Sequence, residues 1–439
     1  MNLFAYYVLQ LTLILSFNIG LLATLSIAEP ITRLIIDILI IILFVISLIT
    51  TVQKKLAIFP FFKLVLLIFL ITFISYLFTD VTLVDYLMFH RKVLLYFFFF
   101  YALFNINFSK VQIEKVFKVI IILFLTQIFA TFIKLLTVGV MEPYIGTIGI
   151  LGGSIATIMP LIALSYIFST YLVEKKTTIL LLVPLFIMIG IASSKIAIIV
   201  YLFALFSFLL LIYTFKNNGM FINLKLFFKY TLMALLLLGS VSSAYISLNP
   251  RLNPEGKVGG SINFKHIENY FEMYNNADSL SYAKSSRVHG QGRSDAHSAV
   301  LNVLYKNDSI LLGMGPGDII KSSYGRGYKK DPLLEKYKIG YGGRIGYLWI
   351  AMQIGYIGSF LLGLFNLYLL VDIARNNRYI KKDSNYKYIL AFYGLSMVYF
   401  LDYLTYSSTF LLDPAIILTY LFSYFYIKKI ILGDINETR

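Results

Sequence analysis

The sequence has no cysteine and few charged residues. The absence of cysteine means that neither disulfides nor thiolate ligands contribute to the fold. Charged residues make up only 14% of the 439 residues, whereas soluble domains have roughly 25%. Hydrophobic residues make up 59%. This composition excludes a soluble globular domain and predicts an integral membrane protein.

Sequence motifs for metal, hydrolase or nucleotide chemistry are also missing. There is no paired His or Cys spacing, no Ser-His-Asp arrangement and no Walker loop. These absences argue against a metal site, a hydrolase and an ATP-driven pump, and we expect no cofactor. The net charge of +16 does not indicate a nucleic-acid partner, because lysine and arginine mostly lie between apolar runs. The first apolar run lacks a basic leader and a small-residue cleavage site, so we expect it to be retained.

Apolar runs near 20 residues recur along the chain, and each is long enough to cross about 30 Å of hydrocarbon. The runs are continuous rather than alternating, which predicts helices and excludes a β-barrel. We therefore predict an all-α, polytopic membrane helix bundle of about twelve transmembrane helices with one long, partly helical external loop. The predicted spans cover residues 5–27, 31–51, 57–79, 93–106, 117–138, 151–172, 179–193, 196–214, 228–248, 346–371, 388–406 and 412–427.

This pattern divides the chain into three parts. Residues 1–249 hold the first nine predicted spans, residues 250–344 form the long hydrophilic loop, and residues 345–439 hold the last three spans and a tail. Lysines gather in one set of alternate short connections, as cytoplasmic connections do. We therefore predict that both termini are cytoplasmic and that the loop is external. The lysines concerned include Lys54, Lys55, Lys110, Lys115, Lys118, Lys175, Lys176, Lys387, Lys428 and Lys429.

Arginine has the opposite distribution from lysine. Seven of the ten arginines fall on the predicted outer side. Loops longer than about 60 residues escape the positive-inside rule, which accounts for the loop arginines but not for Arg33 and Arg91. The planar guanidinium suits bidentate binding of phosphate or carboxylate. We therefore predict an anionic ligand on the outer face, held in part by Arg91.

Ionisable residues within predicted spans are few and are expected to pair or to line cavities, because charge is costly at membrane depth. Arg33 and Asp37 stand four apart and are predicted to pair. Lys195 lies at the outer junction of two spans, where it can meet a lipid headgroup; snorkelling to the interface is the alternative. The other in-span charges are Lys63, Lys134, Asp402 and Asp413.

The long loop is predicted to fold as a small helical cap. Residues 262–274 have the spacing of an amphipathic helix. Ser294 or Asp295 is expected to cap a helix that runs to about Asn307, with Val300, Leu301 and Leu304 on its apolar side. Asp331-Pro332 predicts the start of another helix.

A candidate acid–base pair lies in this loop. Arg293 and His297 stand four apart and share a helix face, so arginine can hold phosphate beside a histidine that takes up a proton. The alternative is that His297 packs against Leu301 and that Arg293 is solvated. Arg287 and His289 lie a few residues earlier.

Gly313, Gly315 and Gly317 form a G-x-G-P-G turn, followed directly by Asp318. Glycine permits positive φ and lets backbone N–H groups approach an anion closely. A purely structural turn is the alternative. It is not a dinucleotide fingerprint, because no βαβ unit surrounds it.

Several motifs together resemble one protein family. Residues 311–317 read LLGMGPG, residues 347–349 read YLW, and residues 355–358 read GYIG. Residues 146–149 and Ser194-Lys195 resemble the glycine-rich outer turn and the Ser-Arg junction of that family, with lysine in place of arginine. With many spans and one large outer loop late in the chain, the sequence resembles the O-antigen polymerase (Wzy type) and O-antigen ligase superfamily.

The resemblance implies a metal-independent glycosyltransferase in the bacterial inner membrane that acts on undecaprenyl-diphosphate-linked oligosaccharides at the outer face. It implies a role in O-antigen, lipopolysaccharide or capsule biosynthesis, with membrane lipids, a chain-length regulator and a flippase as partners. The ligases of the family carry a His-Asn pair just before the span after the loop, whereas residues 342–346 read GGRIG here, which favours a polymerase.

In this interpretation arginines stabilise the diphosphate leaving group, and His297, His289 or Asp318 deprotonates the acceptor hydroxyl. The expected catalytic residues are Arg293, His297 and Asp318. The expected substrate-binding residues are Arg287, His289, Arg344, Lys195, Arg91, Gly313, Gly315 and Gly317.

Two alternatives to a polymerase stay open. One is ligase-like glycan transfer. The other is a polysaccharide flippase, which also has about twelve spans but is expected to concentrate its ionisable groups within the bundle. In this chain they are concentrated in the loop.

Overall fold

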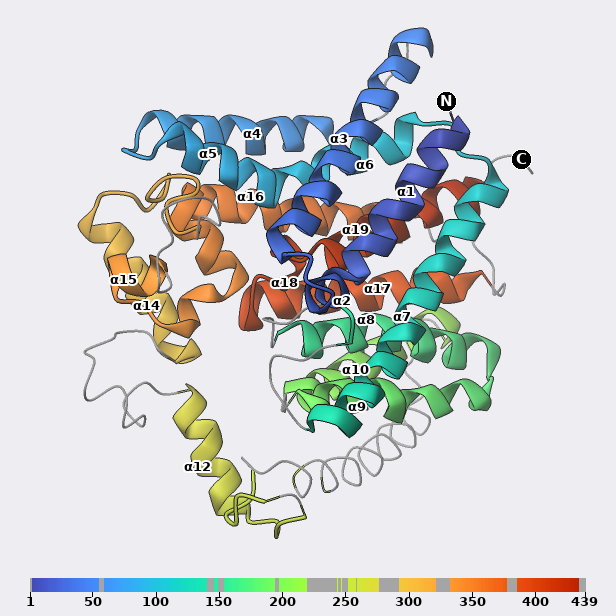
Figure 1. Cartoon of the computed structure of the whole chain (residues 1–439), viewed down its shortest axis with the longest axis vertical. Helices are drawn as coiled ribbons and strands as arrows, with labels where there is room; N and C mark the ends of the chain where they lie inside the picture. The colour runs from blue at the N-terminus through green and yellow to red at the C-terminus, as the bar shows by residue number, and fades with distance from the viewer. Residues whose placement is uncertain are drawn as a thin grey trace.

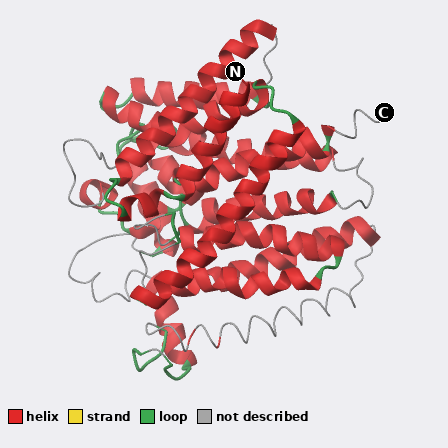
Figure 2. Cartoon of the chain, turned by 45° about the vertical axis from the view of Figure 1, so that its right-hand side comes forward, coloured by secondary structure: helices red, strands yellow, loops and turns green. Residues whose placement is uncertain are grey.

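The structure is a computed structural model, and its described part is helical. It contains no strand among these residues, so the predicted all-α class is confirmed (Figure 2). The described residues are 2–54, 59–139, 146–148, 154–193, 197–218, 243, 246, 252–257, 259–275, 292–320, 332–376 and 385–433.

Within these residues, eight helices are long and apolar enough to cross a membrane. They are α3 (Glu29–Lys54), the continuous segment α5 (Leu83–Phe89), η1 (His90–Leu94) and α6 (Leu95–Asn105), α7 (Lys110–Val138), α8 (Ile155–Glu174), α10 (Ala197–Asn218), α16 (Gly346–Asn376), α17 (Tyr386–Leu401) with η6 (Asp402–Tyr406), and α19 (Pro414–Tyr426) with η7 (Ile427–Ile431).

Shorter apolar helices account for further predicted spans. They are α1 (Asn2–Phe17), α4 (Phe62–Leu77), and η2 (Thr177–Leu181) with α9 (Leu182–Ala192). Each predicted span except 228–248 falls on a helix, and 228–248 lies outside the described residues apart from Ser243 and Ile246.

Two predicted boundaries are wrong. The first span is interrupted at Asn18, where α1 ends and the short α2 (Ile19–Thr24) begins. The span predicted over 93–106 starts at Leu83 instead. Its first ten residues carry charges that interrupt the apolar run, but Thr82 and Asp85 form a capping box that starts the helix there.

The centre of the bundle is built around α17, which packs on α8, α10 and α16. Gly394 of α17 lets the backbones approach closely, because an added Cβ would lie 2.8 Å from Ser165 of α8. On the side toward α19, the rings of Tyr399 and Tyr420 stack with centroids 5.7 Å apart. This packing joins α17 to α8 on one side and to α19 on the other.

Helices of the long loop lie at one end of the bundle, and both termini lie at the other (Figure 1). They are α12 (Phe264–Asn275), α14 (Arg293–Lys306), α15 (Pro332–Tyr337) and η4 (Tyr341–Arg344). The three helices predicted in the loop are therefore present. The predicted cap of α14 is wrong: Gly292 occupies that position, and the Ser294 hydroxyl instead donates to the Asp295 carboxylate at 3.3 Å.

Candidate functional site

The first turn of α14 lies against η6, and η6 in turn contacts the ends of α8 and α10. Arg293 is the first residue of α14, and its guanidinium carbon lies 4.5 Å from the ring centroid of Tyr406 in η6. The Tyr406 hydroxyl is 2.9 Å from that of Thr157 in α8. Its ring also meets the ring of Tyr201 in α10 edge-on, with centroids 5.6 Å apart. Arg293 therefore sits over an aromatic floor supplied by η6 and α10.

A buried carboxylate lies one turn before Tyr406. Asp402 is fully buried, and its Oδ2 accepts a hydrogen bond from the Phe410 backbone N–H at 2.8 Å. Its Oδ1 has no hydrogen-bond partner among the described residues. Arg293 is close enough to interact electrostatically with this carboxylate. A buried acid is costly unless it is compensated, and the positive charge of Arg293 compensates it in part.

His297 lies one turn further along α14 and faces α16. Its Nδ1 is 3.2 Å from the Tyr347 hydroxyl, and the ring of Tyr356 is 6.2 Å away. The buried face of α14 consists of Ala296, Val300 and Leu304, while Leu301 is exposed. The expectation that Leu301 belongs to the apolar side is therefore wrong, and His297 contacts tyrosines of α16.

A hydrogen-bonded serine links the two halves of this region. Ser359 of α16 donates to the Tyr347 carbonyl at 2.9 Å, and its hydroxyl is 2.7 Å from that of Tyr403 in η6. The contacts of His297 with α16 and of Arg293 with η6 are thus tied together. We call Arg293, His297, Tyr347, Asp402 and Tyr406 the α14 site.

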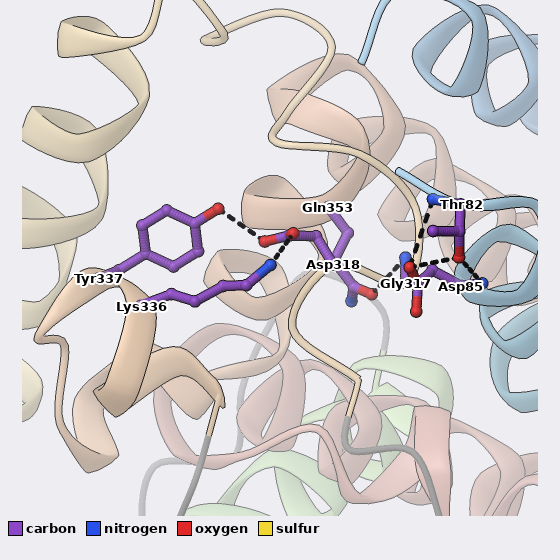
Figure 3. A network of polar contacts seen from close by, with 7 residues as sticks. All are labelled: Thr82, Asp85, Gly317, Asp318, Lys336, Tyr337 and Gln353. Carbon is purple, nitrogen blue, oxygen red and sulfur yellow. Dashed lines mark hydrogen bonds and ion pairs between the residues drawn. The ribbon is translucent and has the colours of Figure 1, made fainter. Parts of the chain in front are cut away.

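The glycine turn has a packing role in this structure (Figure 3). The N–H groups of Gly315 and Gly317 donate to the backbone and side-chain carbonyls of Gln353, at 3.0 and 3.1 Å. Gly313, Gly315 and Gly317 all have positive φ, and a Cβ added at Gly317 would lie 2.0 Å from the Asp85 carbonyl oxygen. These donors are bonded within the protein, which corrects the expectation that they face an anion.

Asp318 is held by α15, also shown in Figure 3. Its Oδ1 pairs with Lys336 at 2.5 Å, and its Oδ2 accepts from the Tyr337 hydroxyl at 2.6 Å. Both carboxylate oxygens are therefore engaged. This arrangement supports a role in fastening α15 to the glycine turn rather than the expected role as a base.

Two arginines of the long apolar helices form salt bridges. Arg91 of η1 pairs with Asp37 of α3, whereas Arg33 pairs with Glu29 at 2.9 Å. The predicted pairing of Arg33 with Asp37 is therefore wrong. A salt-bridged Arg91 has part of its charge neutralised, so the structure supports a bridging role between α3 and η1 more directly than the predicted ligand contact.

The other predicted residues fall into two groups. Arg344 is exposed at the end of η4, which packs against α14 and α16, so it lies near the α14 site. Arg287, His289 and Lys195 lie outside the described residues. In the part of the chain that the structure describes, no group of three or more His, Asp or Glu side chains is arranged to hold a metal ion.

Sequence reasoning identified Arg293 and His297 but missed the aromatic floor. Tyr406, Tyr201 and Thr157 come from three helices far apart in the sequence and carried no motif. Asp402 had a signal, since it is one of the few charges within a predicted span.

The α14 site combines a fixed guanidinium, an imidazole, a buried carboxylate and tyrosine rings at one end of an apolar helix bundle. These groups can bind an anion, accept a proton and stack on a sugar ring. No protein-family model matches the chain, and no curated protein matches its sequence. Fold and site thus define a helical membrane protein with a polar, aromatic-lined site beneath a loop helix.

Proposed function

We propose that the protein is a polysaccharide repeat-unit polymerase, a metal-independent membrane glycosyltransferase for O-antigen or capsule. Its substrate is an undecaprenyl-diphosphate-linked oligosaccharide, and it acts at the outer face of the bacterial inner membrane. The observation that carries this proposal is the position of Arg293, whose guanidinium lies over Tyr406 one helical turn from His297. The motifs at residues 311–317 and 355–358 support the same function through their resemblance to the polymerase and ligase superfamily.

The proposal includes a topology of twelve spans with an external loop and cytoplasmic termini. The positions of α14 and α15 support it, because they lie at the end of the bundle opposite both termini (Figure 1). In this topology the α14 site opens to the outer leaflet, where lipid-linked diphosphates present their glycans.

The proposed reaction is a substitution at the anomeric carbon of the growing glycan. The acceptor hydroxyl attacks this carbon and forms the new glycosidic bond, while the bond from the carbon to the diphosphate oxygen breaks. Undecaprenyl diphosphate leaves with the electron pair, and Arg293 stabilises the added negative charge. His297 takes the hydroxyl proton, and its contact with Tyr347 orients the imidazole.

Tyr406 acts on Arg293 rather than on the substrate. Its ring supports the guanidinium through a cation–π contact, and Asp402 lies one turn before it in η6. Tyr201, which is partly exposed, also offers a face on which a sugar can stack. A guanidinium positioned before the substrate arrives needs no reorganisation during the reaction.

The two alternatives have less support. Ligase-like transfer calls for a histidine near Arg344, and the sequence has none after His297. A flippase calls for ionisable groups that line a path through the bundle. Arg33 and Arg91 instead form salt bridges with neighbouring helix residues.

Purified protein in lipid nanodiscs tests the proposal. Given only lipid-diphosphate repeat units, with a chelator present, it should make a ladder of longer lipid-linked oligomers. Arg293→Ala should abolish the ladder, and Arg375→Ala, at the exposed far end of α16, should leave it. Ladders that form only after a lipid A-core acceptor is added would replace polymerase with ligase.

A further inference from the structure

A large apolar cavity lies between α7, α8, α9, α17 and α19, away from the α14 site. Its volume is about 230 Å³, and its wall includes Phe124, Ile162, Phe186 and Leu395. An apolar cavity of about 150 Å³ stays dry and binds benzene, so a larger one with the same kind of wall favours hydrocarbon over water. Leu125 of α7, which also lines it, is exposed, so the cavity reaches the outer surface of the bundle.

Four aromatic rings close one end of the cavity. Phe117 of α7 stacks on Tyr426 of α19 with centroids 4.3 Å apart, and Tyr388 of α17 lies 5.4 Å from Tyr426. Tyr166 of α8 completes the group, 5.9 Å from Tyr388. Tyrosine is enriched where a membrane meets water, so this end is expected to lie at the headgroup level.

Lysines flank this aromatic end on three helices. Lys118 is next to Phe117, Lys387 is next to Tyr388, and Lys428 follows Ile427, another residue of the cavity wall. Lys387 pairs with Glu174, and Lys428 pairs with Asp372 at 3.0 Å. Lys118 is exposed and adds positive charge. Because Lys387 and Lys428 are already paired with carboxylates, the positive charge that this lysine rim offers to a phosphate is that of Lys118.

The cavity is distant from the α14 site. Tyr388 at its closed end and Tyr406 of the α14 site stand 18 residues apart along α17 and η6. At 1.5 Å per residue this separation is about 27 Å, close to the hydrocarbon thickness of a bilayer. A lipid whose phosphate lies at the lysine rim therefore belongs to the leaflet opposite the α14 site, and it is not the lipid-linked substrate.

We propose that this cavity binds one acyl chain of an anionic phospholipid, whose phosphate lies at the aromatic end of the cavity beside Lys118. The apolar wall selects the chain, the tyrosine rings mark the depth of the glycerol region, and Lys118 favours an anionic headgroup. The site does not depend on the proposed polymerase activity.

The test uses the full-length protein in phosphatidylcholine nanodiscs that contain a trace of phosphatidylglycerol with a photoreactive acyl chain. After irradiation, peptide mass spectrometry locates the adducts. We expect them on the segments 117–125, 162–167 and 388–395, at least about tenfold above those on the exposed face of α4. Equal labelling of α4 and of these segments would overturn the proposal.

Cavity-filling variants make the test specific. Ala163→Phe on α8 and Ser423→Leu on α19 each fill the cavity from a different side, and each should remove the adducts. Leu70→Phe, on the exposed face of α4, is the matched control and should leave them. Adducts that survive in both filled variants would show that the label reports ordinary contact with the bilayer. Either filled variant suffices if the other does not yield folded protein.

The headgroup preference is tested separately. A photoreactive phosphatidylcholine with the same chain should label these segments less than phosphatidylglycerol does. Lys118→Gln should reduce that difference, whereas Lys306→Gln, on α14, should not. Equal labelling by the two lipids in the unchanged protein would refute an anionic headgroup.

Discussion

The contact between Arg293 and Tyr406 yields the sharpest prediction about catalysis. If Tyr406 holds the guanidinium where the diphosphate leaves, removing the ring should slow turnover even though Tyr406 carries no charge. A cation–π contact contributes roughly 0.5–2 kcal/mol, which corresponds to roughly a 2- to 30-fold loss of rate. Tyr406→Leu should therefore reduce ladder synthesis by that factor. Tyr406→Phe keeps the ring and loses the hydroxyl contact with Thr157, so it should retain most of the activity.

Removing Arg293 should slow ladder synthesis more than removing the Tyr406 ring does. A charge-assisted hydrogen bond contributes about 1.5–3 kcal/mol, and losing about 3 kcal/mol from the transition state slows the reaction by more than a hundredfold. Arg293→Ala should therefore abolish visible ladders. Arg293→Lys should recover little, because lysine keeps the charge but not the planar fork.

The assay is the rate of oligomer formation in nanodiscs, with protein abundance and thermal midpoint measured for every variant. If Tyr406→Leu keeps full activity while Arg293→Ala has none, the position of Arg293 over Tyr406 is not its working position. Full rescue by Arg293→Lys would show that bidentate geometry is unnecessary.

Three further predictions follow from the site and the fold. His297→Gln should slow ladder synthesis by roughly 10²- to 10⁴-fold, whereas Ser298→Ala, on the same exposed turn, should not; equal effects would exclude a specific proton acceptor. Gly317→Ala should lower the thermal midpoint, because its Cβ would lie 2.0 Å from the Asp85 carbonyl, while Gly256→Ala, with open space, should lower it less. In this cysteine-free chain, Lys306→Cys should react with an impermeant maleimide added to spheroplasts, and Lys176→Cys should not; reversed labelling would invert the topology.

Most of the membrane helices could be predicted from the sequence, because a run of apolar residues is a local property. The segment before residue 93 was missed because Asp85, Arg91 and Lys92 interrupt the apolar run. Their charges are compensated by contacts that a run of residues does not reveal, such as the salt bridge between Arg91 and Asp37. Arg33 was predicted to pair with Asp37 because the two residues are four positions apart on one helix. In the fold, Asp37 pairs instead with Arg91 of η1.

The candidate site was predictable only in part, for a similar reason. Arg293 and His297 lie on one helix, so their spacing alone places them on one face. The glycines of the turn were recognised, but the surfaces that they approach were not, because Gln353 and Asp85 come from other helices. Glycine spacing indicates where the backbone closely approaches another group. It does not tell whether that group belongs to a ligand or to the protein itself.

The break in α16 shows how backbone contacts within the protein, in place of contacts with a ligand, affect the electrostatics of the site. The helix is interrupted at Ile354 and Gly355, and an interrupted membrane helix has two new ends with opposite partial charges. In many transporters such ends coordinate ions. Here the carbonyls of Met352 and Gln353 accept from Met314 and Gly315, and the Tyr356 N–H donates to the Ile310 carbonyl at 3.0 Å.

One stretch of loop therefore forms hydrogen bonds with the helix on both sides of the break. Residues 310–317 bond two carbonyls at the end of the first half-helix and one N–H at the start of the second, which leaves fewer backbone groups there to attract an ion. These bonds hold the interrupted segment of α16 against the glycine turn. Charge in the α14 site then comes from its side chains, which single substitutions can remove, and not from the backbone of a broken helix.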